Sequence, residues 1–118
     1  MTWTFRKTLF GIALGALTAA GASANANEIS VLTAWYGQSC GTAHGNVTSH
    51  VKAACDRKAT CDYRVEVGTL GDSAPGCRKN MVVLYGCAGQ GNVHLAQLPA
   101  EASGSILQLS CAANEMRR

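Results

Sequence analysis

The sequence has little of what catalysis or nucleic-acid binding requires. It contains only three histidines and seven acidic residues, and no Ser/His/Asp or Cys/His signature accompanies the histidines. The acidic residues are scattered over expected strand faces and turns, so no carboxylate pair indicates acid–base catalysis. Ten basic residues leave a net charge of only +3. We therefore expect no enzymatic activity and no nucleic-acid partner.

The sequence also lacks the spacing of a metal site. The C-x-x-C pattern is absent, and the best zinc ligands on offer are His44, His50 and the cysteines. Zinc binding through these residues is the alternative to disulfide formation. We expect no metal and no cofactor.

The N-terminus has no apolar run long enough to span a membrane. The run over residues 9–20 is shorter than the roughly 20 residues that a spanning helix needs. It follows the basic pair Arg6 and Lys7, and residues 22–26 contain two small-x-small cleavage patterns. Residues 1–26 are therefore predicted to be a cleavable secretory signal peptide. A membrane anchor is the alternative.

Residues 27–118 are predicted to form a single domain that has no membrane contact after cleavage. Loss of the signal removes two positive charges, so this part of the chain is close to neutral. All six cysteines of the chain lie in it: Cys40, Cys55, Cys61, Cys77, Cys87 and Cys111. An even set of cysteines on a short exported chain indicates a disulfide framework. The expected location is secreted or periplasmic.

Alternation of apolar and polar residues predicts strands. Five are expected, at about residues 28–35, 61–67, 81–87, 93–98 and 105–111. In the first, Ile29, Val31 and Trp35 are expected on one face, with Ser30, Leu32 and Ala34 on the other. In the second, Cys61, Tyr63, Val65 and Val67 are expected to point inward.

The third expected strand is apolar on both faces, which predicts that it is covered on both sides. Met81, Val83, Tyr85 and Cys87 form its inward row, and Val82 and Leu84 lie on the opposite face.

One segment has helical spacing instead. Val47, Val51, Ala54 and Cys55 form the stripe of a short amphipathic helix, with Asn46 as its expected N-cap. Turn-rich loops are expected from Gly68 to Lys79 and from Gln90 to Gly104. The predicted fold class is α+β: a small disulfide-stapled antiparallel β-sandwich-like domain of about five strands with one short helix.

Four landmarks occur in the order found in one lectin family: Ala34–Gln38, Val51–Cys55, Cys61 and Gly71–Cys87. Together they resemble the galactose- and rhamnose-binding lectin domain of the sea urchin egg type. The spacings from Asp72 to Lys79 and from Lys79 to Cys87 are those of the family. The resemblance covers about residues 28–87.

The chain departs from the family pattern at several points. Gln38 replaces an arginine, Asn80 replaces a tyrosine, and Cys77 lies three places later than the family's cysteine. The family's opening L-x-C strand is missing, whereas a strand of that character, Ile106–Cys111, lies at the C-terminus. We interpret this as a circular permutation, in which the C-terminal strand fills the same place.

Six cysteines allow fifteen disulfide pairings, and the resemblance selects one of them. The pairs that it implies are Cys40–Cys77, Cys55–Cys61 and Cys87–Cys111. The last of these would hold the permuted strand beside the third strand.

The resemblance also implies a sugar site at Tyr36, Asp72, Gly76 and Lys79. Asp72 would accept from vicinal hydroxyls, Lys79 would donate, and Tyr36 would offer a ring face with a polar tip. Gly76 would let the main chain approach the ligand. The implied function is carbohydrate binding by an exported single-domain lectin whose partner is a glycan or glycoconjugate, with weak binding or homo-oligomerisation for avidity.

Each of these residues also has a structural interpretation. Asp72 is an ordinary turn former, Lys79 a solvated residue at a strand start, and Tyr36 a ring packed under a loop. The family's binding glutamate has no counterpart, because Cys111 is followed by Ala112. The alternative function is protein binding on the lectin scaffold, as an inhibitor or envelope component.

Overall fold

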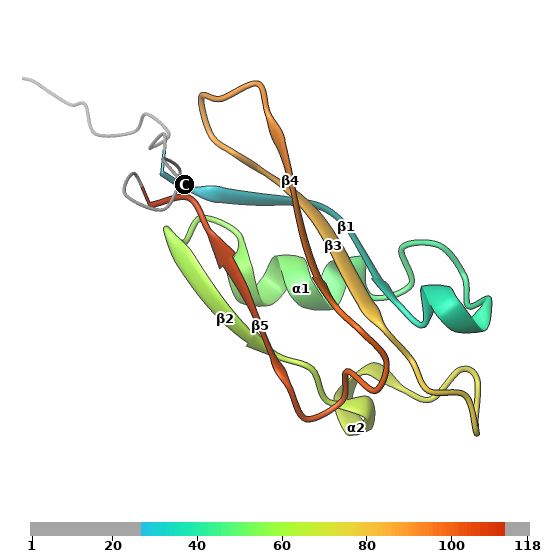
Figure 1. Cartoon of the computed structure of the whole chain (residues 1–118). Coiled ribbons are helices and arrows are strands. Elements are labelled where there is room, and N and C mark those ends of the chain that lie inside the picture. Colours follow the sequence, from blue (N-terminus) through green and yellow to red (C-terminus); the bar gives the residue numbers. More distant parts are fainter. Residues whose placement is uncertain (1–26, 113–118) are drawn as a thin grey trace, which may run out of the picture.

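A computed structural model describes residues 27–112, so the expected signal segment lies outside the described residues. Five strands, two helices and one 3-10 turn follow one another along the chain (Figure 1). Their order is β1 (Ile29–Tyr36), η1 (Gln38–Cys40), α1 (Thr48–Cys55), β2 (Thr60–Arg64), α2 (Val67–Leu70), β3 (Met81–Cys87), β4 (Val93–Leu98) and β5 (Ile106–Ser110). The five expected strands are confirmed. The second helix, α2, lies where a strand end and a loop were expected.

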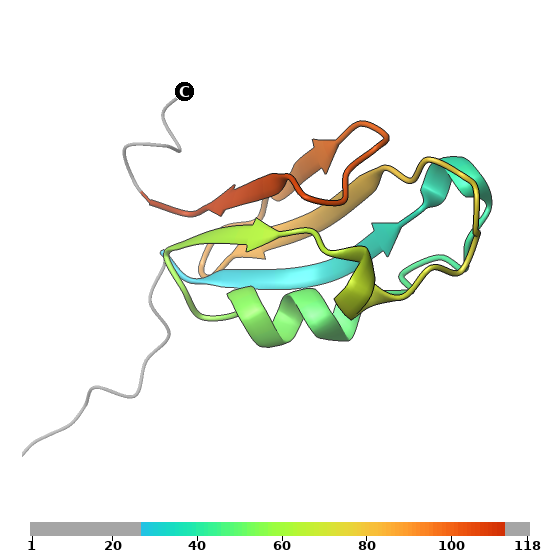
Figure 2. The ribbon, with the colours of Figure 1, turned by 90° about the horizontal axis from the view of Figure 1, so that it is seen from below.

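The strands form two antiparallel sheets, one with the order β1-β3-β4 and the other with the pair β2-β5. Figure 2 shows the β2-β5 pair on one side of the three-stranded sheet and α1 running beside β1. Side chains from both sheets and from α1 form one buried core, which includes Ile29, Val51, Val65, Met81, Val83 and Leu109. The coarse prediction of a small disulfide-stapled α+β domain is confirmed.

A β-bulge in β1 changes which side chains point inward. Ile29 and Val31 are buried as expected, but the register then shifts between Val31 and Thr33. A bulge adds one residue to the strand and so reverses the alternation beyond it. Ala34 is therefore fully buried, and the prediction that Trp35 shares a face with Ile29 and Val31 is wrong.

The second strand is shorter than expected. Its ladder with β5 ends at Arg64, and Val65 is buried just beyond it. The chain then turns into α2, where Gly71 N–H donates to Val67 O at 2.8 Å. Val67 begins this helix with 37% of its surface exposed, so the prediction that it points inward is wrong.

The outer face of β3 is less covered than expected. Its inward row is buried, which confirms Met81, Val83, Tyr85 and Cys87. On the opposite face Val82 and Leu84 are only half-buried, and Leu95, the cross-strand neighbour of Leu84, is 55% exposed. Among the described residues nothing packs over this face fully, so the expected cover on both sides is not found.

The N-terminus of α1 does not use Asn46 as its cap. The helix begins at Thr48, and Val47 in the cap position makes no side-chain hydrogen bond to it. The Asn46 amide instead accepts from Tyr36 N–H at 2.9 Å and donates to Tyr36 O at 3.0 Å. It therefore extends the edge of β1 as a neighbouring strand would, because its side-chain amide carries the same donor and acceptor as a peptide group.

The outer edge of β1 is fully occupied by α1 and its flanking residues. Val31 N–H donates to Asp56, and Val31 O accepts from Lys52, with which Asp56 forms an ion pair. Ala34 is bonded in the same way by Thr48 and Val47. Main-chain groups of Ile29 and Tyr36 also have partners, so this edge offers no free donors or acceptors.

Three disulfides cross-link the described residues, and no cysteine among them is free. The pairs are Cys40–Cys77, Cys55–Cys61 and Cys87–Cys111, the same pairs that the resemblance implies. They indicate an oxidising, extracellular-type environment. None of the helices in residues 27–112 is long and apolar enough to cross a membrane.

The C-terminal strand does not lie where the permutation placed it in the sheet. Cys87–Cys111 does connect the end of β3 to the residue after β5. The hydrogen-bonded neighbour of β5, however, is β2 rather than β3. The disulfide therefore joins two different sheets, since Cys87 belongs to the three-stranded one.

Candidate functional site

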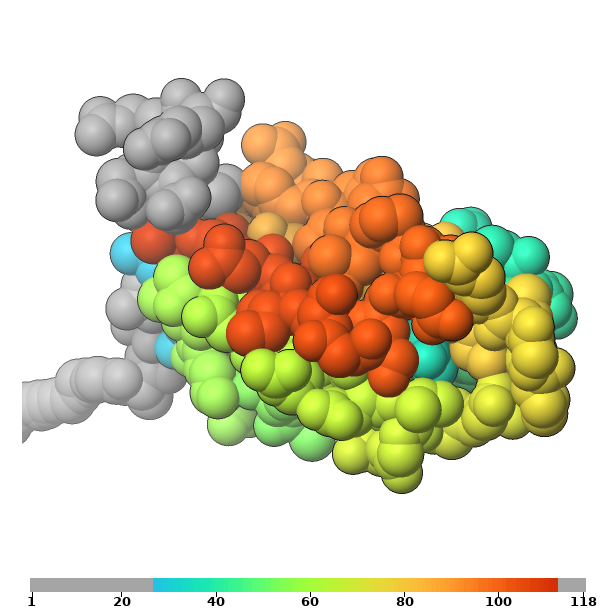
Figure 3. Space-filling view, turned by 60° about the horizontal axis from the view of Figure 1, so that its bottom comes forward, coloured from blue at the N-terminus to red at the C-terminus, as the bar shows by residue number. Residues whose placement is uncertain are grey.

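One pocket gathers all four residues expected at a sugar site. It has a volume of about 280 Å³, and Tyr36, Asp72, Gly76 and Lys79 line it. Its other lining residues are Val67, Cys77, Glu101 and Ser103. We call it the Asp72 pocket. In the space-filling view the segment around residues 70–80 lies beside the segment around residues 100–104 (Figure 3).

A disulfide and a side-chain amide hold the end of β1 against the 71–79 loop. Cys40–Cys77 ties η1 to this loop with a Cα–Cα distance of 6.0 Å. Asn80 accepts from Ser39 N–H at 2.9 Å through its side chain and from Gly37 N–H at 2.9 Å through its carbonyl. The two family departures Gln38 and Asn80 also contact each other, at 3.5 Å.

The loop between β4 and β5 forms the opposite wall. Ala102 is buried, and its N–H donates to Lys79 O at 2.9 Å. Ser103 Oγ accepts from Val67 N–H at 3.0 Å, which joins this loop to α2. These two bonds bring Glu101 and Ser103 to the pocket from a distant part of the sequence.

Lys79 is the central polar group of the pocket. Its side chain is only 5% exposed, so the alternative interpretation of Lys79 as a solvated residue is wrong. The ammonium forms an ion pair with Asp72 Oδ1, donates to Cys77 O at 3.1 Å, and lies 5.9 Å from the centre of the Tyr36 ring. A buried cation needs such partners, because an uncompensated charge in the interior is costly.

The apolar surface of the pocket is not where the sequence placed it. Tyr36 is only 3% exposed, so its ring supports Lys79 and offers little open surface to a ligand. Val67 is 37% exposed and lines the same pocket. Strand alternation gave no signal for this role, since it placed Val67 in the core.

Two carboxylates line the pocket, those of Asp72 and Glu101, and only Asp72 was expected from the sequence. Asp72 is 46% exposed, and its Oδ1 is held by Lys79. Glu101 is 58% exposed and has Arg78 as its nearest cation, at 3.9 Å between Oε2 and Nε. Glu101 lies in a loop without a motif, so nothing in the sequence indicated its position.

Two glycines permit the backbone path around the pocket. Gly76 has φ +83°, and a Cβ there would meet no heavy atom within 4 Å, so the conformation alone favours glycine. Gly37 has φ +95°, and a Cβ there would lie 2.8 Å from Thr42 Cγ2 and 3.3 Å from Lys79 Cγ. A side chain at residue 37 would therefore disturb Lys79 directly.

Outside this pocket, His44 and His94 pack against aromatic rings. Among residues 27–112 there is no group of three or more potential metal ligands. His44 packs edge-on against Trp35, with 4.6 Å between ring centres, and His94 stacks on Tyr85 at 5.3 Å. Burial raises the pKa of the Tyr63 phenol above its usual value.

No family model, curated protein or solved structure matches this chain. The lectin resemblance thus rests on the order and spacing of sequence landmarks.

Proposed function

We propose that the protein binds carbohydrate, with galactose- or rhamnose-type sugars as ligands, in the Asp72 pocket. The observation that supports this is the convergence of Tyr36, Asp72, Gly76 and Lys79 on one pocket of about 280 Å³. That volume lies at the lower end of the range for small-molecule sites, which suits one or two sugar rings.

The pocket offers the donors and acceptors that neighbouring hydroxyls require. Lys79 uses two of its three N–H groups on Asp72 and Cys77 O, which leaves one for a ring or hydroxyl oxygen. Asp72 Oδ2 and the Glu101 carboxylate accept from hydroxyls, and Val67 packs against the C–H face of the sugar. Glu101 supplies the second carboxylate that the family pattern leaves unfilled.

A single small and open site binds its sugar weakly. Repetition of the site in a homo-oligomer, or on a surface that carries many copies of the glycan, would raise the overall affinity. A secreted or periplasmic protein meets such surfaces, and the three disulfides suit that environment.

The test is binding of the oxidised, exported form to immobilised glycans, with free rhamnose and free galactose as competitors. We expect binding that these sugars displace. Lys79→Met keeps the apolar stem of Lys79 and removes only the charge, so it should weaken binding about tenfold or more. Glu101→Gln, in a more exposed position, should weaken it less.

The matched control is Asp62→Asn, an exposed carboxylate on β2 that lies outside this pocket. It should leave sugar binding unchanged. A folded, fully disulfide-bonded sample that binds no glycan would contradict the proposal, as would unchanged binding by Lys79→Met.

A further inference from the structure

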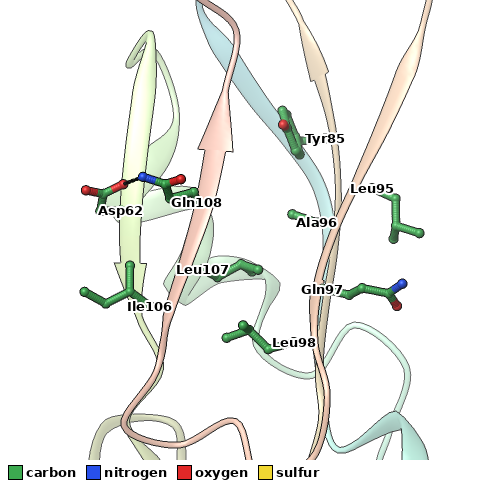
Figure 4. Close-up of a pocket in the computed structure, with 9 residues that line it drawn as sticks. All are labelled: Asp62, Tyr85, Leu95, Ala96, Gln97, Leu98, Ile106, Leu107 and Gln108. Carbon is green, nitrogen blue, oxygen red and sulfur yellow. Dashed lines mark hydrogen bonds between the residues drawn. The ribbon is translucent and has the colours of Figure 1, made fainter. Parts of the chain in front are cut away.

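A second hollow lies between β4 and β5 and shares no residue with the Asp72 pocket. It is an open groove of about 600 Å³, shown in Figure 4 with its lining side chains. These are Asp62, Tyr85, Leu95, Ala96, Gln97, Leu98, Ile106, Leu107 and Gln108. We call it the β4–β5 groove.

One wall of this groove is a strand edge with free main-chain groups. The residues just before and just after β5 form main-chain hydrogen bonds with the residues that flank β2. Ser105 O accepts from Val65 N–H, and Cys111 N–H donates to Ala59 O. Hydrogen-bonding direction alternates along an antiparallel strand. The main-chain N–H and C=O groups of Leu107 and Leu109 therefore also point toward β2. Those of Ile106 and Gln108 point away from β2, into the groove.

The free edge of β5 has a partner at only one end. Ser110 exchanges hydrogen bonds with the Tyr85 hydroxyl, at 3.1 Å for its N–H and 3.3 Å for its O. The main-chain groups of Ile106 and Gln108 have no partner among the described residues. Ile106 and Gln108 are the neighbouring outward-facing residues of this edge, and together they can pair with an added strand.

The other wall is also a strand edge. β4 pairs with β3 only, and no main-chain hydrogen bond leaves its other edge within residues 27–112. Neither β4 nor β5 contains a charged residue or a proline, the usual features that keep an edge strand from pairing. This differs from β1, whose outer edge is occupied by Asp56, Lys52, Thr48 and Asn46.

The side chains around the groove indicate what kind of segment fits. Ala96 and Leu98 of β4 and Leu107 of β5 point into the space between the two strands, so apolar surface lies on both walls (Figure 4). Ile106, 48% exposed, lies on the outer face of β5 beside the groove. Asp62 is the one charged residue that lines the groove, and Gln108 Nε2 donates to its Oδ1 at 3.0 Å. Charge complementarity calls for a basic side chain opposite Asp62.

We propose that an extended segment of another protein binds in the β4–β5 groove by adding a strand to the free edge of β5. Its main chain pairs with Ile106 and Gln108, its apolar side chains pack on Leu98 and Ile106, and a lysine or arginine faces Asp62. Strand addition of this kind draws affinity from the main chain and specificity from alternate side chains. The proposal is independent of sugar binding, because the two sites share no residue.

The first test is amide hydrogen exchange, measured residue by residue with NMR. In the free protein the amides of Leu107 and Leu109 should exchange slowly, and those of Ile106 and Gln108 should exchange fast. The probe is a capped peptide of alternating valine and threonine with one central lysine. Its addition should slow exchange at Ile106 and Gln108.

Matched peptides and variants separate strand addition from simple apolar contact. A peptide N-methylated at alternate residues cannot pair and should not bind. Replacing the central lysine by glutamate, or making Asp62→Asn, should weaken binding by about fivefold, as for an exposed ion pair. Ile106→Lys, at a position already exposed, should weaken it by about tenfold or more through lost apolar burial and charge repulsion.

Three results would each overturn the proposal. Slow exchange at Ile106 and Gln108 that depends on protein concentration would identify a second copy of this chain as the occupant. Equal binding of the N-methylated peptide would show that no strand is added. Absence of binding by the lysine peptide to the folded protein would remove the site altogether.

Discussion

The Asp72 pocket and the β4–β5 groove differ in how their polar groups are arranged. In the pocket the polar groups are side chains, and the buried Lys79 ammonium already has Asp72 and Cys77 O as partners. In the groove the free polar groups are main-chain N–H and C=O on a strand edge, bordered by Leu98 and the exposed Ile106. The first arrangement suits a small polyhydroxylated ligand, and the second suits a polypeptide.

The two sites also depend on different parts of the fold. The pocket is assembled from four separate segments and held by Cys40–Cys77 and by the hydrogen bond from Ala102 to Lys79. The groove depends on two regular strands whose ladders are complete on the far side. Changes in loops should therefore affect the pocket alone.

The strongest test of this separation is removal of the Cys40–Cys77 disulfide. The double variant Cys40→Ser and Cys77→Ser frees a loop whose ends are 37 residues apart, so the free energy of unfolding should fall by about 2–4 kcal/mol. Urea denaturation measures this loss. Sugar binding should disappear, while exchange of the β5 amides and binding of the lysine peptide should stay unchanged. Loss of peptide binding in the folded variant would show that the two sites are coupled.

A smaller effect should distinguish the two partners of the ion pair. Asp72→Asn leaves the Lys79 ammonium buried beside a neutral amide, which should lower the free energy of unfolding by about 1–3 kcal/mol. Lys79→Met leaves a half-exposed Asp72 that water can solvate, so its cost should be below about 1 kcal/mol. Both variants should weaken sugar binding about tenfold or more. The opposite order of stability would mean that Lys79 contributes mainly through packing.

Part of this structure could be predicted from the sequence because burial imposes a period on strands. The inward row of β3 and the positions of all five strands follow from that period. The bulge after Val31 could not be predicted, since one extra residue in a strand changes the pairing and leaves the composition as it was. The end of β2 was misplaced for a related reason: Val67 continues the alternation in sequence while the chain turns into α2.

The candidate site was predictable where its residues belong to one spaced motif. Asp72, Gly76 and Lys79 come from a single loop, and the resemblance of that loop to the lectin motif implied them. Glu101 and Ser103 reach the pocket through hydrogen bonds from Ala102 to Lys79 and from Val67 to Ser103, which no local pattern encodes. The free edge of β5 was equally hidden, because it depends on which strands pair.

The smallest expected effect concerns a buried nitrogen behind the β4–β5 groove. His94 stacks on Tyr85 with 5.3 Å between ring centres, and its Nε2 has no hydrogen-bond partner among the described residues. This contrasts with the Asp72 pocket, where the buried ammonium has its partners. His94→Phe keeps a stacked ring and removes the unpaired nitrogen, so the free energy of unfolding should rise by about 1 kcal/mol in urea denaturation. Sugar and peptide binding should both be unaffected, since His94 lines neither site. A loss of stability instead would show that His94 Nε2 makes a hydrogen bond in solution.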